Sequence, residues 1–234
     1  MAVNDFALVQ GLSDTRSTLR RWNASPWPVV RAWTTGAFAV ATAMLLGVLA
    51  IATFALPDPT PLWISGVSGP VDLDDVAGIL FRNSLVLALH AFACVAGFIA
   101  GASLPLTAAR HSGVSRWVHE KARPIALAWV VIVTCFSLIT QTYILGSDGS
   151  TLAAQLDLSP GMLVLTVIPH ALPELVALFL PLAAWTIASR RNEWNELLAA
   201  TFATTAIAIP VLVASASWEA YVWPRLLGLA SPVA

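Results

Sequence analysis

The chain has 234 residues, of which 58% are hydrophobic and 11% are charged, and its mean hydropathy is +0.78. Soluble domains carry about 25% charged residues, so this composition excludes an ordinary soluble domain and indicates a membrane protein. The formal net charge is −1, and no basic run lies among aromatic residues, so no nucleic-acid partner is indicated. We predict an all-α fold, a polytopic transmembrane helical bundle whose surroundings are the lipid bilayer.

Residues 1–30 form a polar and basic segment ahead of the first long apolar run. Phe6, Val9 and Leu12 recur at helical spacing among charged residues, which favours a short amphipathic helix at the membrane surface. A flexible tail is the alternative, and the pattern of a secretory signal peptide is missing. We expect a single transmembrane domain to follow, over residues 31–234.

Five apolar runs follow, each long enough for the roughly 20 residues that a membrane-crossing helix requires. Pro124 suits the start of the third run. Ala93, Gly97 and Gly101 recur every four residues in the second, and such a row of small residues lets another helix approach closely. The predicted spans are 32–56, 79–102, 124–145, 161–188 and 197–217.

Basic residues gather at one side of the predicted spans. Ten of the twelve Lys and Arg residues lie on that side, and the two opposite loops contain Asp residues but no Lys or Arg. By the positive-inside rule, the N-terminus is cytoplasmic and the C-terminus is outside. The ten residues are Arg16, Arg20, Arg21, Arg31, Arg110, Arg116, Lys121, Arg123, Arg190 and Arg191.

The fourth predicted span carries ionisable residues deep in apolar sequence. His170 and Glu174 are four residues apart, so they share one helical face. Pro169 and Pro173 each remove a backbone donor, so we expect the helix to be kinked or broken beside a small hydrated cavity. An ionisable pair inside a membrane segment is costly and indicates a functional site.

The second predicted span brings His90 to a similar depth. His90 lies eleven residues past residue 79, while His170 and Glu174 lie nine and thirteen residues past residue 161. At about 1.5 Å per residue, all three fall near the middle of a core about 30 Å thick. Asn83 shares a face with His90 but lies nearer the outer side. Glu174, His170, His90 and Asn83 are therefore the candidate catalytic residues.

Several kinds of chemistry are compatible with these side chains. A structural clamp would hold Glu174 protonated, or paired with His170 or Arg82. A site that handles protons or a substrate would use the same groups. His90, His170 and Glu174 are also candidate ligands of zinc, with water completing the site. A Cys94 nucleophile with His90 as its base is a further alternative.

Arg82 and Glu219 both fall near the outer interface in the predicted topology. An Arg side chain can extend toward the interface, and Trp218, Tyr221 and Trp223 fit an aromatic belt. We interpret both charged residues as determinants of topology and anchoring.

Two stretches resemble the stage II sporulation protein M family. One runs from Phe81-Arg82-Asn83 through Phe92 and Gly97, and the other is Ile168-Pro169-His170-Ala171-Leu172-Pro173-Glu174. The resemblance covers about residues 75–220. It implies a multi-pass protein of the bacterial cytoplasmic membrane, and it carries the family motif over to Asn83, His170 and Glu174.

The resemblance also implies a function. The founding member of that family works with partners that remodel peptidoglycan, and relatives accompany transporter components or the machinery of circular bacteriocins. The expected role is a non-catalytic membrane component of an envelope-remodelling or export assembly, with protein partners or as a homo-oligomer. The sequence has no P-loop, so ATP-driven work would need a partner ATPase.

Two alternatives stay open. One is an intramembrane hydrolase or peptide-cyclising enzyme, in which Glu174 acts as acid or base with His170 and His90, and Asn83 donates to an oxyanion. The other is a proton-coupled transporter with a His and Glu relay. The sequence assigns no cofactor, and zinc is the one metal its side chains suggest.

Overall fold

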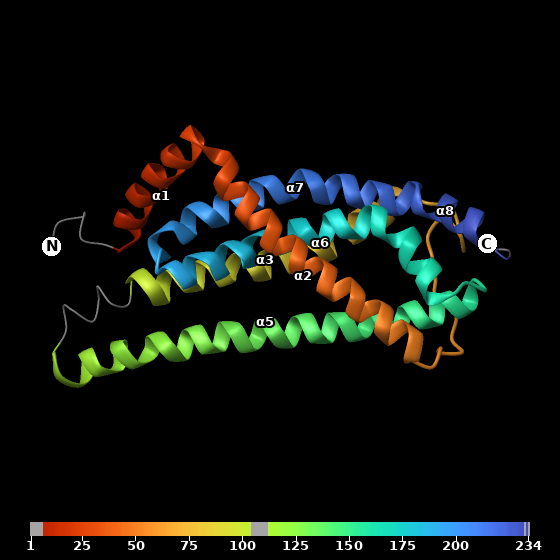
Figure 1. Cartoon of the computed structure of the whole chain (residues 1–234), viewed down its shortest axis with the longest axis horizontal. Coiled ribbons are helices and arrows are strands. Elements are labelled where there is room, and N and C mark those ends of the chain that lie inside the picture. The colour runs from red at the N-terminus through yellow and green to blue at the C-terminus, as the bar shows by residue number, and fades with distance from the viewer. Residues whose placement is uncertain (1–6, 104–111, 232, 234) are drawn as a thin grey trace. The chain divides into compact units, whose positions relative to one another are not determined.

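The computed structural model of the chain describes residues 7–103, 112–231 and 233, which fold almost entirely into helices (Figure 1). These residues contain no strand, and Ser65 and Gly69 form an isolated bridge. The predicted all-α fold is confirmed. In chain order the elements are α1 (Ala7–Ala24), α2 (Pro26–Phe54), α3 (Leu73–Phe98), the π-helical turn η2 (Ile99–Ser103), α5 (Gly113–Gln155), α6 (Pro160–Arg191), the 3₁₀ turn η3 (Trp194–Glu196), α7 (Leu197–Tyr221) and α8 (Trp223–Ala230).

Five helices in the described part of the chain are long and apolar enough to cross a membrane, as predicted. Most of them extend beyond the predicted spans, because hydropathy marks only the apolar part of a helix and the backbone hydrogen bonds continue past it. The orientation of the termini stays a prediction, and Arg110 lies outside the described residues. The membrane-length segments are Pro26–Phe54, Leu73–Ala102, Leu127–Gln155, Pro160–Arg191 and Trp194–Tyr221.

Helix α5 is longer at both ends than its predicted span. Pro124 lies inside the helix rather than at its start. At the other end, Gly146 lets α5 approach α2, since a Cβ atom there would lie 2.6 Å from Cγ2 of Ile51. This packing favours a helix through Gly146 and Asp148, residue types that in isolation indicate a loop.

Helix α6 passes Pro169, Pro173 and Pro181 without a break. In Figure 1 its ribbon changes direction in the first half, which contains Pro169 and Pro173. A proline removes one intrahelical hydrogen bond and its ring presses on the preceding turn, so a bend is the expected response. Of the two outcomes predicted from the sequence, the structure shows the kink and not the break.

The chain stays helical beyond the fifth predicted span, because α7 continues and α8 follows it. Pro224 lies in the first turn of α8, where its missing N–H group is tolerated. Leu227 is fully buried in a cluster with Ile64, Leu156 and Leu163. The C-terminal segment is therefore part of the packed structure.

Helix α1 forms where the N-terminal pattern predicts an amphipathic helix, although Phe6 lies outside the described residues. A Cβ atom at Gly11 would lie 2.7 Å from the Phe98 ring, so α1 packs closely on α3. Arg21 forms an ion pair with Glu196 of η3. The position of α1 at a membrane surface stays a prediction.

Contacts between residues divide the chain into two compact units. Five helices are divided between the two units, so that each has one part in unit 1 and the other in unit 2. They are α2, α3, α5, α6 and α7. The prediction of one domain over residues 31–234 stays a prediction. Unit 1 comprises Met1–Ala37, Leu87–Thr134 and Phe179–Ile207, and unit 2 comprises Phe38–Val86, Cys135–Leu178 and Ala208–Ala234.

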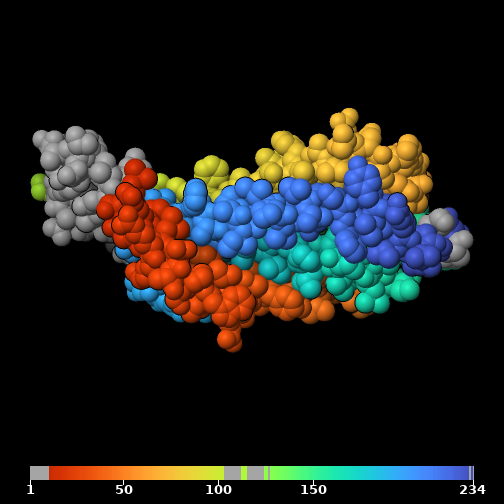
Figure 2. Space-filling view, turned by 90° about the horizontal axis from the view of Figure 1, so that it is seen from above, coloured from red at the N-terminus to blue at the C-terminus, as the bar shows by residue number. Residues whose placement is uncertain are grey.

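In unit 2 the loop between α2 and α3 is held against α5. The Gln155 amide accepts a hydrogen bond from the Leu62 N–H at 2.9 Å and donates one to the Leu62 carbonyl at 3.0 Å. Asp72 and Asp75 cap the start of α3, since each carboxylate accepts a hydrogen bond from the other residue's N–H. Figure 2 shows the start of α3 beside the C-terminal part of α7.

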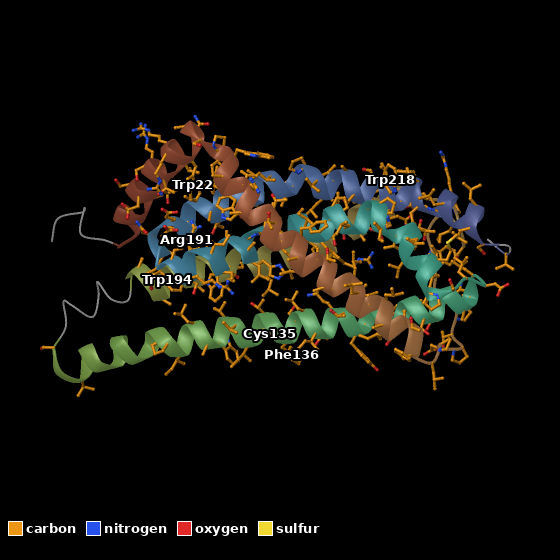
Figure 3. The ribbon with its side chains drawn as sticks, in the orientation of Figure 1. Trp22, Cys135, Phe136, Arg191, Trp194 and Trp218 are labelled. Carbon is orange, nitrogen blue, oxygen red and sulfur yellow. The ribbon has the colours of Figure 1, made fainter. Side chains whose placement is uncertain are left out.

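Helix α5 is the least buried of the five membrane-length helices. Only 6% of the most apolar window in Leu127–Gln155 is buried, against 39% in the α3 segment. Trp129, Phe136 and Ile139 are among its exposed side chains, and Figure 3 marks Phe136 on this helix. Most of the surface of this window is therefore free to contact lipid or another chain.

Candidate functional site

Unit 2 contains a cavity of about 270 Å³ that is lined mainly by residues of α2, α5 and α6. Aliphatic side chains of α2, α5 and α6 form most of its wall, among them Leu45, Leu152 and Val167. Four described polar side chains with acid–base character also line it: Asp148, His170, Glu174 and Glu219. We call this space the carboxylate cavity.

Glu174 of α6 is the centre of a charged group within unit 2. Its carboxyl interacts with the carboxyl of Glu219 on α7 and with the Arg82 guanidinium on α3. Glu219 interacts with Arg82 as well. Arg82 and Glu219, expected only as residues of the outer interface, thus belong to the same electrostatic group as Glu174.

The Asn83 side chain lies close enough to the Glu174 carboxyl to interact with it. Nevertheless, neither Asn83 Nδ2 nor Glu174 Oε2 has a hydrogen-bond partner of ordinary geometry among the described residues, and both atoms are buried. A buried polar atom without a partner costs free energy. The pair therefore has hydrogen-bonding capacity left for water, a ligand or a partner.

His170 lies one helical turn before Glu174, and its side chain is buried. Its ring packs against Trp223, with ring centroids 5.6 Å apart. The Trp223 Nε1–H donates to Thr166 Oγ1 at 3.2 Å, and the Ser215 hydroxyl donates to the His170 carbonyl at 3.3 Å. These contacts fix the imidazole, whose Nδ1 has no hydrogen-bond partner within residues 7–103, 112–231 and 233.

The described contacts of His90 lie in unit 1. Its fully buried ring meets Phe179 edge to face, with centroids 5.4 Å apart. The thiol of Cys94, one turn further along α3, donates to the Pro181 carbonyl at 3.1 Å. The contacts that surround His90 and Cys94 are thus different from those of the carboxylate cavity.

The small-residue row of α3 and η2 faces two tryptophans in unit 1. A Cβ atom at Gly97 would lie 2.6 Å from Trp185 Nε1, and one at Gly101 would lie 2.7 Å from the Trp194 Cβ. Ala93 is buried on the same row. The absence of a side chain at both glycines is what allows these indoles to approach the helix.

No group of three or more His, Cys, Asp or Glu side chains in the described part of the chain is placed to hold a metal ion. The three expected zinc ligands, His90, His170 and Glu174, do not form such a group. Because the residues do not fit a metal centre, we derive no step through one.

Three polar or aromatic lining residues, Asp148, Glu219 and Trp223, were not expected at this site from the sequence. Glu219 and Trp223 are four residues apart, but Val222 separates α7 from α8, so this spacing does not place them on one helical face. The spacing therefore gives no sequence signal for either residue. Their contacts with Glu174 and His170 depend on tertiary packing.

Five helices that are long and apolar enough to cross a membrane indicate a polytopic α-helical membrane protein. A family model described as Stage II sporulation protein M matches residues 122–224, so the chain is SpoIIM-like over this part. The predicted resemblance is thereby confirmed. No curated protein and no solved structure matches the chain.

The matched residues include His170, Glu174, Glu219 and Trp223. They do not include Asn83 or the stretch from Phe81 to Gly97, so the match begins later than the predicted resemblance at about residue 75. The cavity wall that α5, α6, α7 and α8 supply lies within the matched part. The roles of Arg82 and Asn83 depend on the geometry alone.

Proposed function

We propose that this chain is the non-catalytic membrane component of an envelope-remodelling or export assembly in the bacterial cytoplasmic membrane. In this proposal the carboxylate cavity receives an apolar segment of the cargo that bears a positive charge. The charge of the cavity wall is the observation that carries the proposal. It has three carboxyl groups, and no Lys or Arg is among its described lining residues.

Three carboxyl groups in a mostly aliphatic wall are unfavourable when no ligand occupies the cavity. Arg82 offsets only part of the charge of Glu174 and Glu219, and it does so from outside the lining. Glu174 and Glu219 are half-buried, and a carboxylate partly removed from water without a full counter-charge is unfavourable. A cationic group on an apolar ligand would supply the missing charge, and the aliphatic wall would contact the rest of the ligand.

The unpartnered polar atoms also favour a binding site over a self-contained clamp. A clamp between helices gains stability when its donors and acceptors are paired with each other. Here Asn83 Nδ2, His170 Nδ1 and Glu174 Oε2 all lack such partners among the residues that the structure describes. Their open capacity supports a role that is completed by a ligand.

Binding of octylammonium to the full chain in nanodiscs tests this proposal, with empty nanodiscs as the blank. Octylammonium should bind at least about tenfold more tightly than octanol or octanoate, because only the ammonium pairs with the carboxylates. The double variant Glu174→Gln/Glu219→Gln should lose this preference. Asp74→Asn, which changes an exposed carboxylate of α3 outside the cavity lining, is the matched control and should keep it.

The assembly itself is tested in cells of the source organism. The tagged chain should copurify with a partner ATPase and cargo, whereas the double variant should retain the ATPase and lose the cargo. Equal binding of octylammonium and octanol would contradict the cavity's role. A chain that copurifies with no other protein would contradict the assembly.

A second candidate is a proton-coupled transporter, favoured by the interaction between Glu174 and Glu219. Two interacting carboxyl groups can share and release a proton, and such pairs mark proton pathways in membrane proteins. In proteoliposomes with an inward pH gradient, wild-type chain should dissipate the gradient faster than Glu174→Gln. Equal rates for the two proteins would exclude this candidate.

The enzymatic alternative has less support from the geometry. The described contacts of His90 lie in unit 1, while Glu174, His170 and Asn83 lie in unit 2. No metal-binding group accompanies them among the described residues. A hydrolase or cyclising enzyme therefore stays the least favoured of the three roles.

A further inference from the structure

Unit 1 has a second pocket, of about 470 Å³, that the proposed function does not use. Residues of α1, α2, α6, α7, η3 and the turn before η3 line it. Its rim carries two cations and two anions, Arg21, Arg191, Glu193 and Glu196. We call it the rim pocket.

The charges on the rim are arranged in pairs. Arg21 of α1 forms an ion pair with Glu196 of η3, and Arg191 Nη1 of α6 lies 4.0 Å from Glu193 Oε2. The Arg21, Arg191 and Glu193 side chains are each at least 41% exposed, so they can rearrange toward a ligand. A rim with both signs of charge fits a dipolar ligand better than a simple anion, because each end of the dipole finds an opposite charge.

The turn that presents Arg191 and Glu193 has a defined backbone. Asn192 has a φ of 58°, the left-handed conformation that commonly ends a helix. The Glu193 N–H donates to the Ala188 carbonyl at 2.9 Å, which closes the last turn of α6. This helix end holds the cation and the carboxylate at neighbouring positions on the rim.

The walls of the pocket combine aromatic and aliphatic side chains. Trp22 and Trp33 meet edge to face, with ring centroids 5.0 Å apart, and both line the pocket. Val29 and Ile187 continue the wall along α2 and α6. Figure 3 marks Trp22 and Arg191 at the same end of unit 1. Indoles beside charged groups at the end of an apolar helix are typical of the headgroup level of a membrane.

We infer that the rim pocket binds the headgroup of a phospholipid that combines a phosphate diester with a primary ammonium group. The phosphate accepts hydrogen bonds from the arginines, and the ammonium donates to the glutamates. A quaternary ammonium has no N–H to donate, and a headgroup with a net negative charge meets the two glutamates without a compensating cation. The lipid's glycerol and first methylene groups contact the apolar wall.

Native mass spectrometry of the full chain in detergent tests this inference, with four probes. They are phosphatidylethanolamine, phosphatidylcholine, phosphatidylglycerol and the soluble headgroup glycerophosphoethanolamine. Phosphatidylethanolamine should bind about tenfold more tightly than the other two lipids. The soluble headgroup should bind more weakly than the lipid, since it lacks the contacts with the apolar wall.

The double variant Arg191→Gln/Glu193→Gln should lose the preference for phosphatidylethanolamine, and both side chains are exposed enough for the variant to fold. Arg225→Gln on the exposed surface of α8 is the control and should keep it. Equal binding of the three lipids, a preference for phosphatidylglycerol, or full binding by the double variant would overturn the inference. If glycerophosphoethanolamine binds as tightly as phosphatidylethanolamine, the ligand of the rim pocket is a soluble headgroup compound and not a lipid.

Discussion

Replacing Gly101 by alanine is expected to destabilise the chain by about 1–3 kcal/mol, the usual effect of overpacking. A Cβ atom at this position would lie 2.7 Å from the Trp194 Cβ, which is bound directly to the backbone. A clash with such an atom is relieved only by moving η2 away from η3. Thermal unfolding in detergent, followed by tryptophan fluorescence, measures the effect.

Gly78→Ala is the matched control for that experiment. Gly78 lies on α3, and nothing is within 4 Å of a Cβ atom built there. Alanine has a higher helix propensity than glycine, so this variant should be as stable as wild type or more stable by about 0.5–1 kcal/mol. An unchanged unfolding temperature for Gly101→Ala would show that η2 and η3 are less closely packed than described.

The second large effect is expected at Arg82. Its guanidinium interacts with both Glu174 and Glu219, so Arg82→Gln leaves two interacting carboxyl groups without their cation. We expect a loss of about 1 kcal/mol in the free energy of unfolding, since Arg82 is exposed and water screens its attraction to the two half-buried carboxyl groups. Adding Glu219→Gln to Arg82→Gln should recover most of this loss.

A double-mutant cycle over Arg82 and Glu219 measures the interaction directly. The two effects should be strongly non-additive, whereas Arg225→Gln, which changes an exposed charge on α8, should leave stability nearly unchanged. Additive effects of Arg82→Gln and Glu219→Gln would mean that Arg82 only anchors the helix end, the role that its position near the predicted outer interface indicates.

The number of spans could be predicted because a membrane-crossing helix needs about 20 consecutive apolar residues. The residues at which the helices begin and end could not be predicted in this way. Gly146 and Asp148 are residue types common in loops, and their helical conformation follows from packing against Ile51 of α2. Hydropathy along one segment contains no information about which other segment packs on it.

The candidate site shows the same limit. His170 and Glu174 could be identified because ionisable residues are rare in apolar spans and their spacing places them on one face. Glu219 and Trp223 join them only through the fold of unit 2. The rise per residue gives the depth of His90 along its helix but not the direction in which its side chain points around the helix axis. Depth alone therefore cannot identify the neighbours of His90.

The exposure of α5 has a consequence for how the protein is made. Its segment has the lowest mean hydropathy of the five, 1.8, and also the smallest buried share, 6%. A segment that few neighbouring helices cover must leave the translocation channel for the lipid by its own hydrophobicity, whereas polar groups elsewhere, such as His170 and Glu174, can be sheltered by packing partners. Integration of α5 is thus the step of biosynthesis in which hydrophobicity exceeds the requirement by the least. Arg116, Lys121 and Arg123, which lie in α5 ahead of its apolar segment, favour one orientation of that segment.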